Sequence, residues 1–444
     1  MSQSVHTVHA DAGQNRADRV GDLVYSDGTA VAVKCDDSPV QHILQVTGEA
    51  ENMPMTLDFL SHLKALPPAT LEPIVCNALS ARDVELLDWH CQPLARGAAG
   101  YILGGHGPYR FEGLARCAGE IQPWSTVLKV AGSGGRSASD DATQPEYWKR
   151  ETELYQSGFL RDLPPGLSTP RCYGVVPLSE REIWLWLEDI PQPADNWTPE
   201  RYGLAAMHLG QFNGAYLMGH PLPPNANWLL AGGRTPGWVA GAESRLNELD
   251  AFIETRMGQR WLQATDRNRV TRLYANRQAL LQALARLPRC LCHHDAFRRN
   301  LLDRRAADGR VETIGIDWAY VGYGGVGQEI AMTTAVTLLW LDVAANQATT
   351  LNEIIFEGYM AGLRDVGWQG DARLARLGYT ATVGLVWGMA WPTFMSRMLG
   401  EVQAAAALED VIGHSADEIM DQWREVQPLI FSMGEEALTL AQIL

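Results

Sequence analysis

The stretch from residue 292 to 318 constrains this chain more than any other. It begins Cys-His-His-Asp-Ala-Phe-Arg-Arg-Asn and ends Gly-Ile-Asp-Trp. Asn300 follows Asp295 by five positions, and Asp317 comes directly after the apolar run 311–316. A short loop leaving Asp295 can turn back within five residues, so that Asn300 faces the same cleft. A strand over 311–316 would then bring Asp317 beside both side chains.

These three side chains are the groups that phosphoryl transfer from a nucleotide requires. One carboxylate accepts the proton of the acceptor hydroxyl, while an amide oxygen and another carboxylate hold Mg²⁺ against the phosphates. We therefore interpret Asp295 as the base, and Asn300 and Asp317 as metal ligands. The alternative is a structural His-Asp pair, because H-x-D-x-x-x-x-N also occurs by chance. The second Asp, seventeen residues beyond Asn300, favours catalysis.

Residues 293–300 resemble the H-x-D-x-x-x-x-N signature of the aminoglycoside phosphotransferases and choline kinases, and residues 316–318 resemble their metal-binding I-D-[FWC] motif. Many members have Gly or Asn where this chain has His294, and the family often has an Asp where this chain has Glu329. The resemblance implies a bilobal, protein-kinase-like fold that phosphorylates small molecules from a nucleotide.

A lysine and a glutamate upstream occur in the order of a kinase. Lys129 lies in the alternating segment 125–130, which predicts a strand with its cation turned into a cleft. A kinase places such a lysine against the phosphates and holds it with a glutamate of the next helix. Segment 144–155 predicts that helix, with Glu151 on its apolar face. Glu151 also matches the R-E-x-x-x-Y pattern of the family. The alternative is a solvated glutamate on an amphipathic helix.

A glycine-rich link at 94–107 joins two expected strands, 90–94 and 109–117. Glycines such as Gly97 and Gly100 let the backbone approach phosphate oxygens and present N–H donors. We predict a nucleotide-binding loop here. A flexible hairpin has the same composition.

The apolar strand expected at 182–187 runs into Glu188, Asp189 and Ile190. A kinase has its hinge at this point. We therefore predict that main-chain groups around these residues meet the purine edge of the nucleotide, while the acidic side chains face solvent.

Three other patterns suggest different sites. Lys34 ends a V-A-V-K segment similar to the V-A-I-K of protein kinases, but no helix with a glutamate on its apolar face follows it. Residues 322–327 fit the G-x-G-x-x-G dinucleotide fingerprint, but a complete βαβ unit is not evident. Cys290 and Cys292 suggest soft-metal binding, but lack a second ligand cluster, and we expect both thiols to point into the core.

Composition narrows the class of protein. The 444 residues are 46% hydrophobic and carry a net charge of −16, which disfavours nucleic-acid binding because surfaces that track phosphates are basic. Seven cysteines form no paired framework, which indicates a reducing compartment. The first twenty residues are unlike a signal peptide, and the apolar stretch 381–395 is too short to span a bilayer and is expected to form a buried helix. We predict a cytoplasmic protein that binds neither membrane nor nucleic acid.

The predicted fold class is α+β, bilobal and protein-kinase-like. Residues 1–85 are expected to form an N-terminal extension with a mobile start. Residues 86–190 would form a nucleotide-binding N-lobe, a small antiparallel sheet with one key helix. Residues 191–444 would form a mainly helical C-lobe with the catalytic loop and the acceptor pocket. The helices expected within 330–444 exceed a minimal kinase and indicate a bulky acceptor.

The predicted activity is Mg²⁺-dependent transfer of the γ-phosphate of ATP, or of GTP, to a hydroxyl of a small molecule. Trp340, Trp387 and Trp391 either line the acceptor pocket or belong to the core. The acceptor is an antibiotic or other natural product, or an amino alcohol or sugar of metabolism. From a different class comes a nucleotide-binding pseudokinase or interaction module without turnover. A protein kinase is disfavoured, because no A-P-E-like segment follows Asp317.

Overall fold

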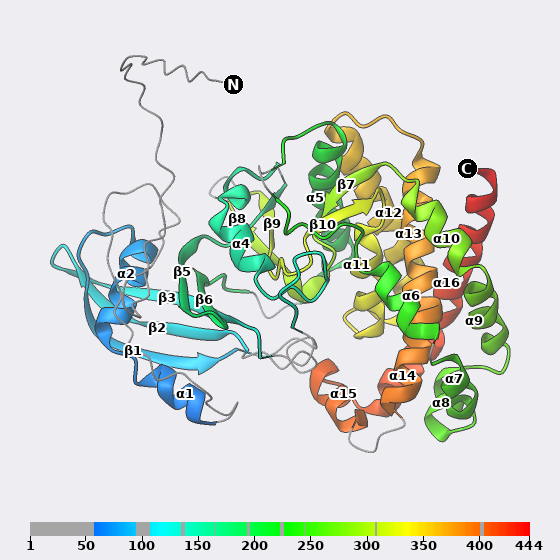
Figure 1. Ribbon diagram of the computed structural model, residues 1–444, viewed down its shortest axis with the longest axis horizontal. Coiled ribbons are helices and arrows are strands. Elements are labelled where there is room, and N and C mark those ends of the chain that lie inside the picture. The colour runs from blue at the N-terminus through cyan, green and yellow to red at the C-terminus, as the bar shows by residue number, and fades with distance from the viewer. Residues whose placement is uncertain are drawn as a thin grey trace, which may run out of the picture.

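The chain folds into a sheet-based N-lobe and a helical C-lobe (Figure 1). The computed structural model describes residues 57–94, 107–134, 138–164, 166–192, 196–222, 226–243, 245–306, 309–399 and 404–444. The antiparallel sheet of the N-lobe and the helices of the C-lobe confirm the predicted α+β, bilobal fold class. Lys34 and the glycines Gly97 and Gly100 lie outside the described residues.

The N-lobe is built on a five-stranded antiparallel sheet in the order β1-β2-β3-β6-β5. The strands are β1 (Glu85–Pro93), β2 (Tyr109–Cys117), β3 (Glu120–Gly132), β5 (Cys172–Ser179) and β6 (Glu182–Glu188). Two helices, α1 (Leu57–Lys64) and α2 (Pro68–Leu79), share one apolar core with this sheet. Both fall within the segment that we predict as an extension.

Strand β3 alternates as its sequence predicts. Trp124, Thr126, Leu128 and Val130 are buried on one face. Because successive side chains of a strand point to opposite faces, Lys129 is turned away from that core. It faces the helix α4 (Arg150–Gln156), with which it forms an ion pair.

Helices make up most of the C-lobe. In chain order these are α5 (Pro199–Leu217), α6 (Thr235–Glu243), α7 (Leu246–Ile253), α8 (Arg256–Trp261), α9 (Asp266–Ala275), α10 (Arg277–Ala285), α11 (Glu329–Leu339), α12 (Ala348–Asp365), α13 (Ala372–Thr382), the π-helix η4 (Val383–Ala390), α14 (Trp391–Leu399), α15 (Ala404–Ile412) and α16 (Ala416–Ile443). Short 3₁₀ turns are η1 (Phe159–Asp162), η2 (Arg298–Asn300) and η3 (Ala345–Gln347). Within the described residues, no helix is both long enough and apolar enough to cross a membrane.

Short strands flank the predicted catalytic residues, in the segment between α10 and α11. β7 (Arg289–Cys292) pairs antiparallel with β10 (Gly322–Gly325), and β9 (Val311–Gly315) lies between β8 (Leu301–Arg305) and β4 (Leu167–Ser168). The glycines of β10 thus belong to an antiparallel ribbon and not to the βαβ unit of a dinucleotide site. Cys290 and Cys292 are both buried, with their Sγ atoms 3.7 Å apart, as expected for core thiols.

Candidate active site

The loop between β7 and β8, the predicted catalytic loop, brings Asp295 and Asn300 together. The Asn300 side-chain amide donates to Asp295 Oδ2 at 2.8 Å and to the Asp295 carbonyl at 3.0 Å. The Asn300 carbonyl accepts the amide of Ile316 at 2.9 Å. The loop therefore turns back within five residues, as predicted, and it is tied to the residue that precedes Asp317.

Lys129 connects the two lobes at this point. Its Nζ lies 2.7 Å from Asp317 Oδ1 and forms an ion pair with Glu151. The other oxygen of Glu151 accepts the backbone amide of Trp318 at 3.1 Å. A strand of the N-lobe, the helix α4 and the segment after β9 thus meet through these charges. The predicted partnership of Lys129 with Glu151 is present in the structure.

Neighbouring charges and burial act in opposite directions on the pKa values of this cluster. Burial acts to lower the pKa of Lys129, but the carboxylates of Asp317 and Glu151 outweigh it and raise that pKa. Burial likewise acts to raise the pKa of Asp317, but Lys129 holds it below its usual value. Burial raises the pKa of Glu151. Asp317 is thus ionised, and a cation can bind it.

Asp317 has a backbone conformation that L-residues rarely adopt. Its φ is +61°, and that of His294 is +63°. Left-handed non-glycine residues persist where the surroundings fix them, and they concentrate at functional sites. One fixing group is the buried guanidinium of Arg150, which donates to the carbonyls of Ala319 at 2.9 Å and Trp228 at 2.7 Å. The sequence pattern contains Arg150 but does not reveal this role.

His293 orients the catalytic loop as a neutral imidazole. Its Nδ1 accepts the amide of Asp295 at 3.2 Å, so its Nε2–H donates to the carbonyl of Ile316 at 2.9 Å. Burial lowers the pKa of His293 to about 4. The ring also packs against Trp318, with the centroids 4.4 Å apart. His293 therefore joins the start of the loop to the strand end that carries Asp317.

Glu329 is a second support of this loop. The carboxylate, at the first position of α11, accepts the amides of His293 at 2.6 Å and His294 at 2.9 Å. It also accepts the side-chain amide of Asn213 at 3.4 Å. Burial raises the pKa of Glu329 to about 7. The sequence indicates Glu329 only through its position, where members of the resembling family often have an Asp.

Arg234 is a site residue that sequence reasoning missed. Its Nη1 donates to Asp295 Oδ1 at 2.8 Å, and its guanidinium lies 3.8 Å from the centre of the Tyr320 ring. Burial raises the pKa of Asp295 to about 6, and Arg234 acts against that rise. Arg234 precedes α6 in a loop without a recognisable motif, and only the fold brings it to Asp295.

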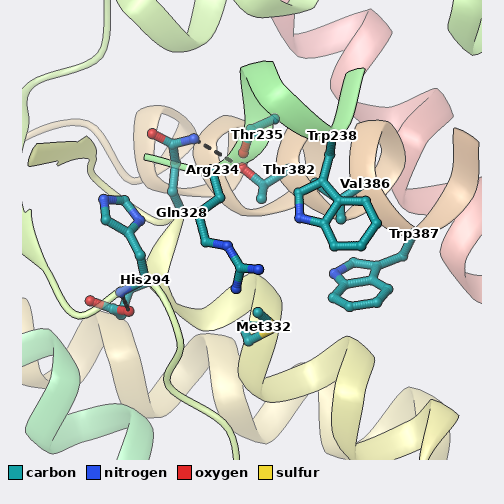
Figure 2. Close-up of a pocket in the computed structure, with 10 residues that line it drawn as sticks. Arg234, Thr235, Trp238, His294, Gln328, Met332, Thr382, Val386 and Trp387 are labelled. Atoms are coloured by element: carbon teal, nitrogen blue, oxygen red, sulfur yellow. Dashed lines mark hydrogen bonds between the residues drawn. The ribbon is translucent and has the colours of Figure 1, made fainter. Parts of the chain in front are cut away.

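Arg234, which binds Asp295, also lines a pocket, and this pocket (Figure 2) is called the pocket beside Asp295 below. Figure 2 shows Trp238 and Trp387 on one side of it, His294 on the other, and the Arg234 guanidinium between them. Trp387 belongs to the π-helix η4, a type of segment that is frequent at functional sites. The other lining residues are Thr235, Gln328, Glu329, Met332, Thr382 and Val386.

The three tryptophans proposed for the acceptor pocket have different places. Trp387 lines this pocket. Trp391 packs against Trp387, with the two ring centroids 5.3 Å apart. Trp340 packs against Phe297, at a centroid distance of 5.3 Å.

The predicted hinge residues lie at the end of β6 and directly after it. Glu188 forms an ion pair with Arg304 of β8 at 2.6 Å, and Asp189 pairs with Arg110 of β2 at 2.9 Å. The Ile190 carbonyl accepts the side-chain amide of Gln192 at 3.3 Å. The prediction that the acidic side chains face solvent is wrong, because both carboxylates are largely buried against neighbouring arginines. A nucleotide contact from this main chain stays a prediction.

Several solved structures are similar to parts of this chain. The amicoumacin kinase hAmiN is similar at 14% identity over 74% of this chain and 88% of that one, with a TM-score of 0.43. A choline/ethanolamine kinase family protein from Mesorhizobium loti is similar at 13% identity over 88% and 100% of the chains, with a TM-score of 0.43. The aminoglycoside phosphotransferase APH(3'')-Id from Streptomyces rimosus is similar at 16% identity over 67% and 93%, with a TM-score of 0.35.

A family model matches part of the sequence. No curated protein matches the chain significantly. Residues 204–368 match the model described as the phosphotransferase enzyme family. This segment contains Arg234, Asp295, Asn300, Asp317 and Glu329. Over this segment, the chain is similar to the phosphotransferase enzyme family.

Proposed function

We propose that this phosphotransferase moves the γ-phosphate of ATP, or of GTP, to a hydroxyl of a small metabolite or natural product such as an antibiotic. The observation that carries the proposal is the convergence of two groups of charges. Lys129 and Glu151 meet Asp317 where the lobes join, and Asp317 lies close enough to Asp295 to raise its pKa.

The residues fit a divalent metal with oxygen ligands. Both hydrogen bonds that the structure gives the Asn300 side chain use its Nδ2, which leaves its oxygen as an acceptor. Asp317 is ionised. One or two protein oxygens together with phosphate oxygens are a usual set for Mg²⁺. Bound there, Mg²⁺ would neutralise charge on the phosphates.

The protein groups divide the remaining work. Glu151 holds Lys129, whose ammonium is placed to bind phosphate oxygens when a metal engages Asp317. Asp295 accepts the proton of the acceptor hydroxyl as the hydroxyl oxygen bonds to the γ-phosphorus. The bond from that phosphorus to the β–γ bridging oxygen breaks, and the nucleoside diphosphate leaves. Positioning and charge stabilisation supply most of the catalysis in such transfers.

The second candidate is a pseudokinase that binds nucleotide without turnover. Lys129, Glu151, Asp295, Asn300 and Asp317 are all present, whereas degenerate kinases usually lose at least one of them. Their ordered contacts favour an active enzyme.

Thermal shift with ATP or GTP, with and without Mg²⁺, tests the proposal. We expect Mg²⁺-dependent stabilisation of the wild type and its loss in Asp317→Ala. Asp295→Asn is the matched control, since it should keep that stabilisation and lose about 10²–10⁴-fold in turnover. Absence of any nucleotide stabilisation would remove the kinase function. Stabilisation with no turnover in wild type would favour the pseudokinase.

A further inference from the structure

The pocket beside Asp295 contains a positive charge, that of Arg234. Among the described residues that line it, Arg234 is the only permanent cation. Burial lowers the pKa of His294 to about 4, so this ring adds no charge near neutral pH. An acceptor that places its hydroxyl at Asp295 must therefore lie against the guanidinium of Arg234.

Arg234 has binding capacity beyond its contact with Asp295. That contact uses Nη1, one end of a planar fork with five N–H donors. Such a fork binds a carboxylate or phosphate group through two parallel hydrogen bonds. The side chain is 24% exposed, and Figure 2 shows it directed into the pocket. The ring of Tyr320 supports it from one face.

The carboxylates near the pocket are already engaged. Glu329 accepts two backbone amides of the catalytic loop, one on each oxygen. Asp295 accepts from Arg234 and Asn300. An ammonium group on the acceptor would therefore meet a like charge and, among the lining residues, no free carboxylate. Close like charges disfavour binding by several kcal/mol.

The aromatic lining fits two kinds of group, and Arg234 decides between them. The faces of Trp238 and Trp387 can hold a cation or an apolar or aromatic body. A cation bound there would share the small pocket with the guanidinium. An aromatic or apolar body carries no charge, so the nearby guanidinium would not repel it.

We propose that Arg234 selects the acceptor by charge: the pocket takes a hydroxyl compound with an aromatic or apolar body and a carboxylate or other anionic group near the hydroxyl, and it rejects ammonium-bearing acceptors. This inference rests on the proposed phosphotransferase function. Arg234 binds the anionic group, the tryptophans contact the body, and the hydroxyl meets Asp295. Arg234 is thus a specificity-determining residue.

Direct binding of three matched probes tests the selection without nucleotide. The probes are mandelate, its amide mandelamide and its amine counterpart 2-amino-1-phenylethanol, followed through tryptophan fluorescence. We expect the carboxylate to bind about tenfold or more tighter than the amide, and the amine weakest. Arg234→Gln should remove the preference for the carboxylate and leave amide binding within about twofold. Arg267→Gln, an exposed arginine paired with Asp250, makes the same charge change away from the pocket.

Equal affinities, tightest binding of the amine, or no binding of any probe into the millimolar range would overturn the selection. So would an Arg234→Gln variant that binds all probes like the wild type but loses turnover equally for every acceptor, because Arg234 would then act on the phosphoryl group. Failure of the kinase function is seen separately, as a missing Mg²⁺-nucleotide thermal shift in the wild type.

Discussion

At the level of single residues, Glu329 holds the catalytic loop with a carboxylate that burial disfavours. Its side chain accepts the amides of His293 and His294, and burial raises its pKa from 4.5 to about 7. The folded state therefore holds the proton more tightly than the unfolded state. The resulting stability is complete below about pH 4.5 and is lost as the pH rises through about 7. The shift corresponds to a loss on the order of 3 kcal/mol.

Glu329→Gln isolates this effect, because glutamine does not titrate. Its Nε2 would also face one of the two loop amides, donor against donor, so the variant should be less stable in acid. We expect the stability advantage of the wild type to shrink by about 3 kcal/mol between about pH 5 and pH 8. Urea unfolding of both proteins across this range measures it. Parallel pH profiles would contradict the assignment.

The residues of the site differ in how far sequence predicts them. Asp295 and Asn300 are five positions apart, so covalent connectivity alone keeps them close, and Asp317 follows on a recognisable strand. Lys129 and Glu151 could be paired from strand and helix periodicity. Arg234 reaches Asp295 from sixty-one positions away. Its loop has no periodicity, so only tertiary packing reveals the contact.

At the level of elements, the contact between α5 and α12 depends on glycine. A methyl group on Gly210 would collide with the carbonyl oxygen of Tyr359, and one on Gly362 with that of Met207. Backbone atoms cannot withdraw as a flexible side chain does, so the helices would have to separate. We expect Gly210→Ala to lower the free energy of unfolding by about 1–3 kcal/mol. Thermal and urea unfolding measure this change.

Gly237→Ala in α6 is the matched control. A Cβ at Gly237 meets nothing within 4 Å. Alanine is favoured over glycine inside a helix by about 1 kcal/mol. The control should therefore be neutral or stabilising. Equal effects of the two substitutions would show that helix propensity, and not the close contact of α5 with α12, determines the result.

Sequence patterns predict the elements unevenly. The alternation in 125–130 and the apolar run 182–187 lie in strands β3 and β6, as expected. The stretch 381–395 was expected as one buried helix, but it comprises the end of α13, the π-helix η4 and the start of α14. Apolar residues fill all sides of η4, so no periodicity marks its wider turn. Burial of α1 and α2 against the sheet is a long-range contact that local patterns do not encode.

At the level of the whole molecule, two ion pairs among the described residues cross between the lobes. Lys129 meets Asp317, and Glu188 meets Arg304. The bilobal fold could be predicted because the order of motifs along the chain implies it. The net charge of −16 follows from composition alone. Its effect on nucleotide binding depends on where the positive groups lie. Lys129 is one positive group at the proposed nucleotide site.

This charge distribution predicts how nucleotide association responds to salt. Mg²⁺-ATP is anionic, so the overall charge of −16 repels it at long range, while Lys129 attracts it only at contact. Salt screens the long-range repulsion more than the partly buried contact. We expect the association rate constant to rise about two- to tenfold between low and physiological ionic strength, with a nearly constant dissociation rate. Stopped-flow tryptophan fluorescence measures both, with uncharged adenosine as the salt-insensitive control. An association rate that falls with added salt would mean that local positive charge dominates the approach of the nucleotide.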